Sequence, residues 1–369
     1  MSSAVYCQRK SQGSALWKCI KDHFYDFVDN YNKNHEKTYG YFRPIIEAVV
    51  DKFLDCGNLQ KGFARIKRPD CKHEYLLSFS CRGRWFCPCC HQKKVLLFGE
   101  FMINTVTYPL PHRQYVFSIP IMLRTYFKYN RKLLTELCHV AQESLLEFMR
   151  IVLSKPDDEL GMAMAIQTFG EYLNFHPHLH AVVADGLFMK SGMFHVLPKG
   201  DIKQLEEIFR NKVIKLLLDE GLLAKEMGAK LLEWKNSGFS VYKGPVIKRG
   251  DKQGLEKVCQ YIIRNTFNEQ KMMYNEESGT VIYRSKKHFN TKRNFEVFKA
   301  IDFIANLTQH IPEKSFQLVR YYGWYSNKKR GMHKQQKIKN EENNNSIPTG
   351  IDIIDISDHT SKKVKKYGK

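Results

Sequence analysis

At 369 residues the chain is long enough for two or three domains, and a hydrophobic content of 43% indicates a globular protein. Lysine and arginine outnumber aspartate and glutamate by 59 to 38, so the formal charge of +21 favours a polyanionic partner, nucleic acid first. No apolar run reaches membrane-spanning length and no secretory signal is evident. We therefore expect a cytoplasmic protein with reduced thiols and no membrane partner.

The first 54 residues are predicted to be helical. Apolar residues recur three and four positions apart in ALWKCIKDHFYDFVDNY and in RPIIEAVVDKFLDCG, and Gly57 provides a helix stop. We expect an N-terminal helical segment, residues 1–54, that packs on the next part of the chain.

Residues 55–95 have the short strands and close cysteines of a small zinc module. Five of the ten cysteines fall between Cys71 and Cys90, which in a reducing compartment indicates a metal site rather than disulfides. Cys87 and Cys90 have the spacing of a tetrahedral zinc turn. Cys71 and Cys81 are the predicted second half of a closed, structural Zn²⁺ site.

That second half has alternatives, because position 68, where a standard zinc ribbon would carry the partner of Cys71, is Arg68. The other candidate ligands are His73, Cys56 and Cys89. Buried free thiols without a metal are the simpler reading of the segment.

From residue 113 onward, predicted strands alternate with predicted helices. Strands are predicted over 113–120, 161–170 and 176–189, a long amphipathic helix over 132–153, and two further helices over 202–219 and 224–234. The short link between the second and third strands predicts an antiparallel hairpin.

The third of these strands carries histidines at alternate positions. In an extended strand His176, His178 and His180 share one face. Two neutral imidazoles from one strand can chelate a divalent metal. Histidines on a half-exposed strand without any ligand are the alternative.

A third metal ligand is predicted from the hairpin. If the turn centres near Tyr172 and Leu173, Gln167 falls opposite His178 and supplies an oxygen; Glu171 is the competing candidate. Two imidazoles and an amide with open positions suit Mg²⁺ or Mn²⁺ bound to a substrate phosphate better than structural zinc.

A basic loop, KGPVIKRGDKQG, leads into the predicted helix LEKVCQYIIRNTF. On its polar side Lys257, Tyr261, Arg264 and Asn265 lie one turn apart. A tyrosine among cations is placed for phosphate chemistry, because the cations attract a nucleic-acid backbone. An exposed tyrosine with no role is the simpler reading in a chain with 19 tyrosines.

The C-terminal part predicts a strand over 279–287, a helix over 295–309 and an aromatic and basic segment, LVRYYGWYSNKKRG. Alternating rings and cations suit single-stranded nucleic acid, although packing of the rings in a core has equal weight. The candidate nucleic-acid contacts are Lys257, Arg264, Arg320, Tyr322, Trp324, Lys328 and Arg330. A basic, largely disordered tail is predicted over 331–369, in which IDIIDI can add a short strand.

Four blocks in colinear order resemble the zinc-domain-bearing rolling-circle insertion-sequence transposases, members of the HUH nuclease group. They are GFARIKRPDCKHEYLLSFSCRGRWFCPCCHQKK, AIQTFGEYLNFHPHLHAVVADGLF, YIIRNTF and LTQHIPEKSFQLVRYYGWYSN. The resemblance implies an N-terminal zinc domain that binds DNA and an HUH domain that cleaves and rejoins single strands. It also implies that His178 and His180 are the metal-binding pair, with His176 an extra imidazole, and that Tyr261 is the nucleophile and keeps the 5′ phosphate.

The chain departs from this family's pattern at two positions. Some members carry a second tyrosine four residues after the first, where this chain has Asn265, so the resemblance implies a one-tyrosine enzyme. Arg68 stands where the family usually has a zinc-knuckle cysteine, which bears on zinc affinity.

We therefore expect an α+β protein with a helical segment (1–54), a zinc-binding and DNA-binding module (55–95), an antiparallel-sheet HUH domain with helices on one face (96–330) and a tail (331–369). The expected function is a transposase that cleaves and rejoins single-stranded DNA, with element ends and target as partners. Alternatives are a replication initiator or relaxase with the same chemistry, and a non-catalytic zinc-dependent DNA-binding regulator. No nucleotide cofactor is expected, because no Walker-type phosphate loop is present.

Overall fold

The computed structural model describes residues 11–83, 85–234, 237–285, 292–342 and 353–354. The chain forms two compact units, each assembled from three separate segments. Unit 1 consists of Met1–Leu96, Thr168–His176 and Arg264–Phe316, and Unit 2 consists of Leu97–Gln167, Pro177–Ile263 and Gln317–Lys369. The units thus alternate along the chain, unlike the consecutive domains expected from the sequence.

Helices form the core of Unit 1. The helices α1 (Ala15–Asp29) and α4 (Pro44–Leu54) occupy the two segments predicted to be helical, and the short α2 (Tyr31–Asn34) and α3 (Glu36–Tyr39) lie between them. Ser14 caps α1 by accepting a hydrogen bond from the Trp17 N–H at 3.1 Å. Against α1 packs α11 (Ala300–Thr308), which adds Phe303 to a buried cluster with Phe24 and Phe27.

Two small antiparallel sheets also belong to Unit 1. One is a two-stranded ribbon of β1 (Phe63–Lys67) and β2 (Glu74–Ser78); the other joins β8 (Met272–Asn275), β9 (Thr280–Arg284) and β10 (Phe295–Lys299). The helix predicted over 295–309 therefore begins only at Ala300. Residues 295–299 are a strand because their backbone groups pair with β9, which would otherwise lack a partner on that side.

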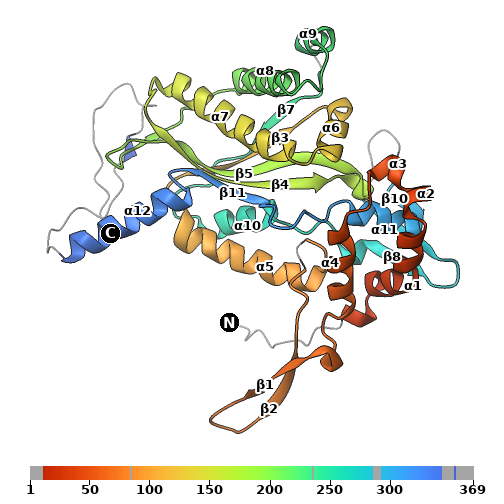
Figure 1. Ribbon diagram of the computed structural model, residues 1–369. Helices are drawn as coiled ribbons and strands as arrows, with labels where there is room; N and C mark the ends of the chain where they lie inside the picture. Colours follow the sequence, from red (N-terminus) through yellow and green to blue (C-terminus); the bar gives the residue numbers. More distant parts are fainter. Residues whose placement is uncertain (1–10, 84, 235–236, 286–291, 343–352, 355–369) are drawn as a thin grey trace. The chain divides into compact units, whose positions relative to one another are not determined.

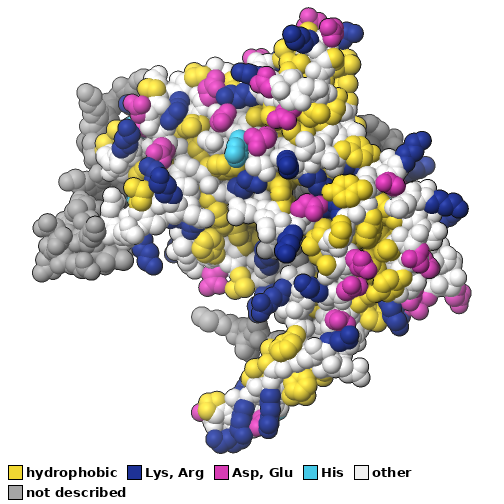
Figure 2. Space-filling view, viewed as in Figure 1, with side chains coloured by type: hydrophobic (Ala, Val, Ile, Leu, Met, Phe, Trp, Pro, Cys, Tyr) yellow, Lys and Arg dark blue, Asp and Glu magenta, His cyan; other side chains and the backbone are white. Residues whose placement is uncertain are grey.

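The β1–β2 ribbon extends away from the helices of its unit (Figure 1). Lysine and arginine gather at its tip and apolar side chains lie along its strands (Figure 2). The exposed apolar residues are Phe63, Tyr75 and Leu76.

A seven-stranded sheet organises Unit 2. Its main path has the order β11-β4-β5-β3-β7, built from β11 (Val319–Gly323), β4 (Glu159–Phe169), β5 (Phe175–Phe188), β3 (His112–Ser118) and β7 (Ser240–Lys243). The strand β3 is antiparallel to both β5 and β7, and β11 is antiparallel to β4. At the end of β5, β6 (Phe194–Val196) pairs in parallel with β12 (Ile353–Ile354), the short strand predicted within IDIIDI.

Helices cover both faces of this sheet, whereas the sequence predicted helices on one face only (Figure 1). On one face lie α7 (Leu133–Leu153) and α8 (Lys203–Asp219), where the ring of Phe209 is 5.1 Å from Phe117 of β3. On the other face lies α10 (Lys252–Ile262). The apolar run in β5 fits this arrangement, since a strand covered on both faces has few positions left for polar side chains.

The remaining α-helices of the described residues are α5 (Pro88–Phe101), which continues into a π-helical turn (Met102–Val106), α6 (Arg124–Tyr129), α9 (Lys225–Glu233) and α12 (Asn327–Glu342). The tail predicted to be disordered thus begins as a helix; its other residues, apart from β12, lie outside the described part of the chain. None of the helices in the described ranges has the length and apolar character needed to cross a membrane.

Candidate functional site

One face of the Unit 2 sheet carries the predicted metal-binding histidines. In the register of β3 with β5, Ser118 stands opposite His178 and Val116 opposite His180, so these side chains share a face with Gln114. The two imidazole centroids are 4.9 Å apart, and the residues are only 8% and 4% exposed. Two buried imidazoles at this separation can bind one cation.

Tyr261 lies near the C-terminal end of α10, over the same face. Its ring meets His180 edge-on, with the centroids 5.4 Å apart and the planes at 88°. Leu255, Cys259 and Ile262 form the buried side of the helix, and Tyr261 is 44% exposed. A substrate can therefore reach the tyrosine while the histidines beside it stay buried.

Gln167 of β4 holds the end of α10. Its Nε2 donates to the carbonyl of Ile262 at 2.9 Å and more weakly to that of Tyr261 at 3.5 Å. A carbonyl accepts only from the amide nitrogen, so the amide oxygen points away from the helix end and is the atom that a metal would bind. The sequence predicted Gln167 as a ligand but not as a helix cap.

The same capping bonds mark where α10 ends, at Ile262 rather than at the predicted Phe267. The β-branched residues Ile262, Ile263 and Thr266 lower the helix propensity there, and Gln167 satisfies carbonyls that a longer helix would have paired. Arg264 and Asn265 consequently lie beyond the helix, not one turn from Tyr261 on its polar side.

Gln114 is a residue of the site that the sequence did not single out. Its side-chain nitrogen lies 3.0 Å from Nδ1 of His180. If His180 binds a metal through Nε2, its Nδ1 carries the proton and needs an acceptor, which the amide oxygen of Gln114 supplies once the amide is turned over. Strand alternation placed Gln114 on one face of β3, but only the register with β5 brings it to His180.

His176 and Glu171 fall in Unit 1, with the turn that links β4 and β5. Tyr172 and Leu173 have positive φ angles of 52° and 63°, in agreement with a tight turn centred on them. The buried His310 donates from Nε2 to the carbonyl of Leu173 at 2.9 Å and so fixes the turn. Metal binding by His176 or Glu171 stays a prediction.

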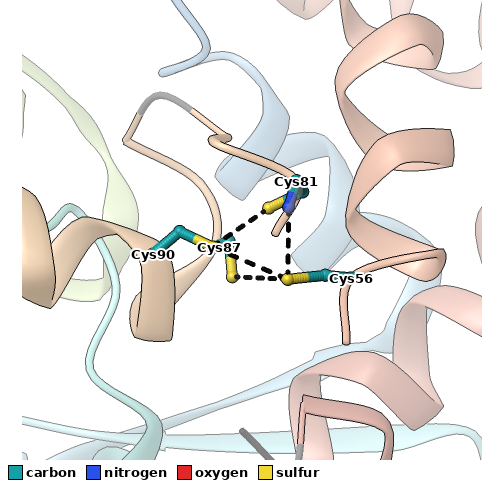
Figure 3. Close-up of side chains that lie close together, drawn as sticks. All are labelled: Cys56, Cys81, Cys87 and Cys90. Atoms are coloured by element: carbon teal, nitrogen blue, oxygen red, sulfur yellow. Dashed lines mark hydrogen bonds between the residues drawn. The ribbon is translucent and has the colours of Figure 1, made fainter. Parts of the chain in front are cut away.

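Four cysteines of Unit 1, Cys56, Cys81, Cys87 and Cys90, gather in one cluster (Figure 3). The sulfur atoms of Cys56 and Cys90 are 3.6 Å apart, those of Cys56 and Cys87 3.9 Å, and those of Cys81 and Cys90 3.5 Å. A tetrahedron with Zn–S bonds of about 2.3 Å has edges of about 3.8 Å. The cluster therefore has the dimensions of a closed Cys₄ zinc site.

The electrostatic interactions among the four thiols also favour a bound cation. Hydrogen bonds with Cys81, Cys87 and Cys90 lower the pKa of Cys56, and the same contacts with Cys56 raise the pKa of Cys81 and of Cys87. Thiols this close cannot all ionise without a compensating positive charge, which Zn²⁺ supplies.

The structure corrects one predicted zinc ligand, Cys71. This thiol is exposed in the loop between β1 and β2, and Cys56, one of the alternatives, completes the cluster. Arg68 belongs to the same loop, so it does not take the place of a ligand. The four clustered cysteines lie before and after the ribbon, at its base. The prediction chose Cys71 because it is nearer to Cys81 in the sequence, whereas Cys56 is more distant in the sequence but lies in the cluster.

Trp324 is a core residue, and the prediction that its ring contacts nucleic acid is wrong. It is 6% exposed and stacks on Phe188, with the centroids 4.9 Å apart and the planes at 3°. Tyr322 and Arg320 face α7: the Tyr322 ring is 6.3 Å from His139, and Arg320 donates to the Thr135 hydroxyl at 2.9 Å.

The other predicted contacts differ in exposure. Lys257 and Lys328 are exposed. Arg330 is half-buried with its guanidinium 5.0 Å from the Tyr321 ring, and Arg264 lies 5.3 Å from the Phe169 ring. A role in binding DNA stays a prediction for these residues.

Two family models match the chain. One, described as "Transposase zinc-binding domain", covers residues 23–119 and includes all four clustered cysteines. The other, described as "Putative transposase", covers residues 161–332 and includes His178, His180 and Tyr261. The chain belongs to this transposase family. Because transposases act on DNA, DNA is the partner that the positive charge of this transposase attracts.

Two relatives match most of this transposase. The "Transposase for insertion sequence element IS801" of Pseudomonas savastanoi pv. phaseolicola is 24% identical over 327 residues, which is 83% of this chain and 77% of the relative. The "Putative transposase y4qJ" of Sinorhizobium fredii is 26% identical over 293 residues, 73% of this chain and 70% of the relative. No solved structure matches this transposase significantly.

Proposed function

We propose that this transposase cleaves and rejoins single-stranded DNA, with Tyr261 as nucleophile and with Mg²⁺ or Mn²⁺ held by His178, His180 and Gln167. The observation that carries the proposal is the contact between Tyr261 and His180, 5.4 Å between ring centroids. The proposed chemistry requires nucleophile and metal to meet at one phosphorus, and the proximity of Tyr261 on α10 to His180 on β5 supports it.

The donor set fits such a cation. Two imidazole nitrogens and one amide oxygen leave coordination positions open for phosphate oxygens. When bound, the cation would neutralise the charge that develops on the non-bridging and leaving oxygens. The bonds from Gln167 to the end of α10 fix the position of Tyr261 relative to the donors.

In the proposed step the phenol oxygen of Tyr261 attacks a phosphorus of the strand. A Tyr261–phosphate bond forms, the bond to the 3′ oxygen breaks, the phenol proton passes to solvent and the departing 3′ oxygen takes up a proton. The 5′ phosphate stays on Tyr261, which conserves the energy of the phosphodiester. A later 3′ hydroxyl reverses the step, joins the strands and restores the phenol, so no nucleotide cofactor is consumed.

The test uses the full chain, Mn²⁺ and 3′-labelled single strands that cover both ends of the DNA element carrying the gene. The 3′ label matters because the 5′ phosphate of the downstream fragment is the part that becomes attached. We expect a labelled protein adduct on a denaturing gel, and mass spectrometry should map it to Tyr261.

Tyr261→Phe should abolish this adduct while DNA affinity changes by about twofold or less. Tyr129→Phe is a matched control, because Tyr129 is also an exposed tyrosine of Unit 2. An adduct that persists in Tyr261→Phe would place the nucleophile elsewhere. Strands left uncut by the unaltered protein would favour the DNA-binding regulator, whereas cleavage without joining to a target would favour a replication initiator.

A further inference from the structure

A cavity of about 680 Å³ opens in Unit 1 beside the cysteine cluster. Its walls come from α4 and the residues after it, from the loop between β2 and α5 that carries Cys81, and from the segment that follows α11. Apolar and cationic side chains both line it, among them Ile45, Val49, Phe79, Lys52, Arg82 and Lys314. The volume lies in the range of small-molecule sites and is sufficient for one nucleotide.

Phe79 presents an exposed ring to this cavity from a fixed backbone. Its N–H donates to the carbonyl of Gly62 at 3.1 Å, and its carbonyl accepts from the N–H of Gly57 at 3.1 Å. The ring lies against Gly62, where an added Cβ would come within 2.7 Å of it. Although held in this way, the residue is 58% exposed, so core packing does not account for it. A rigid, open aromatic ring is a stacking platform.

The cavity also carries surplus positive charge. Both carboxylates that line it are engaged, Asp55 with Lys61 at 3.5 Å and Glu313 with Arg43 at 2.8 Å. Three cations of the lining form no ion pair with any residue that the structure describes: Lys52, Arg82 and Lys314. An anion with a flat, apolar part matches an aromatic ring surrounded by such cations.

We propose that this cavity binds one unpaired nucleotide of the transposase's DNA strand. The base stacks on Phe79, with Ile45 and Val49 as the apolar wall, and the flanking phosphates meet Lys52 and Lys314. In duplex DNA the base faces are stacked on each other, so the site selects a single-stranded or extruded nucleotide. The proposal rests on the proposed function for the identity of the strand, but it assigns binding to residues that take no part in cleavage.

The test measures binding of the zinc-loaded full chain to a single strand from the element end that contains one 5-iodouracil. Fluorescence anisotropy gives Kd, and irradiation followed by mass spectrometry identifies the cross-linked peptide. We expect the cross-link at Phe79 and a Kd about tenfold higher for Phe79→Ala. Lys52→Gln combined with Lys314→Gln removes two phosphate contacts and should reduce the slope of log Kd against log salt by about 1.4.

Two further variants separate stacking from folding. Phe79→Leu keeps apolar volume but removes the ring, so it should lose affinity as Phe79→Ala does while zinc content stays unchanged. Phe63→Ala is the matched control, because Phe63 is a 46% exposed phenylalanine of β1 outside the cavity lining. Equal losses from Phe63→Ala and Phe79→Ala would overturn the assignment.

The source of the nucleotide is tested by competition. A free nucleoside monophosphate that displaced the strand at micromolar concentration would contradict a site built for a strand. The two proposals can be contradicted independently. An adduct at Tyr261 without a cross-link at Phe79 would contradict the nucleotide site but not the proposed cleavage. A cross-link at Phe79 without an adduct would contradict the proposed cleavage but not the nucleotide site.

Discussion

The side-chain nitrogen of Gln114 lies 3.0 Å from Nδ1 of His180. With the amide turned over, its oxygen would accept a hydrogen bond from the Nδ1–H of a His180 that binds a metal through Nε2. An outer partner of a metal-binding histidine commonly contributes 10- to 100-fold to metal affinity or activity. We expect Gln114→Leu to lower cleavage by about that factor and to raise the Mn²⁺ concentration needed for half-maximal rate, with little change in DNA affinity. A Mn²⁺ titration of cleavage together with DNA anisotropy measures both.

Gln114→Glu is the informative control for that variant. A carboxylate can only accept a hydrogen bond, so it holds the Nδ1–H tautomer and should retain most of the activity. If the Glu variant were as impaired as the Leu variant, Gln114 would not act through the tautomer of His180.

His112, buried in Unit 2, makes stability depend on pH. Its Nδ1 donates to the carbonyl of Leu110 at 2.8 Å, its Nε2 accepts from the Tyr325 hydroxyl at 2.7 Å, and burial lowers its pKa to about 4. The unfolded imidazole titrates near 6.5, so the unfolded chain takes up the proton first as pH falls. Stability is therefore full above about pH 6.5 and declines towards pH 4, by roughly 3 kcal/mol.

Urea unfolding at several pH values between 7 and 4.5 measures this loss for Unit 2. His112→Gln removes the titrating group, so its stability should be lower at pH 7 but should change less with pH. A wild-type midpoint that stayed constant over this range would contradict the assignment.

At the scale of elements, the cysteine cluster closes the base of the β1–β2 ribbon. Cys56 precedes β1, Cys81 follows β2, and Cys87 and Cys90 stand at the start of α5. A two-stranded ribbon is marginally stable in isolation. Zinc bound at the base therefore stabilises the ribbon, as pairing with further strands would in a larger sheet.

Cys56→Ser should accordingly remove the bound zinc and lower the melting temperature of Unit 1. Cys71→Ser, which changes the exposed thiol at the other end of the ribbon, should keep one zinc per chain and an unchanged melting curve. Metal analysis and thermal melting measure both effects. Zinc retained by Cys56→Ser but lost by Cys71→Ser would return Cys71 to the ligand set.

Sequence patterns predicted the elements whose signal is local. The periodicity of residues 132–153 became α7, and the alternating histidines lie on β5 with His178 and His180 on one face. What failed depends on partners distant in sequence: residues 295–299 became a strand because β9 pairs with them, and Trp324 entered the core because Phe188 stacks on it. The role of Gln114 was equally inaccessible without the β3–β5 register.

At the scale of the molecule, the segments of each unit depend on one another. The core of Unit 1 combines Phe24 and Phe27 of the N-terminal part with Phe303 from α11. The buried Arg43 donates to the carbonyls of Thr308 at 3.0 Å and Ile311 at 2.7 Å, and so satisfies the C-terminal end of α11. Local sequence patterns could not distinguish consecutive domains from interleaved ones. The amphipathic pattern of a helix shows that one of its faces is buried, but not which distant segment covers that face.

The interleaving predicts how a fragment behaves. Residues 1–96 alone retain the four cysteines but lose α11, so Arg43 lacks its carbonyl acceptors and the faces of α1 and α4 are exposed. We expect this fragment to bind zinc yet to melt without a cooperative transition, because a metal can organise the ribbon and its loop but cannot replace a missing core. Calorimetry and near-ultraviolet circular dichroism measure the cooperativity of melting. A second fragment, residues 1–119, ends where the match to the zinc-binding family model ends. A cooperative melt of 1–96 close to that of the full chain would show that the N-terminal segment folds as an independent domain.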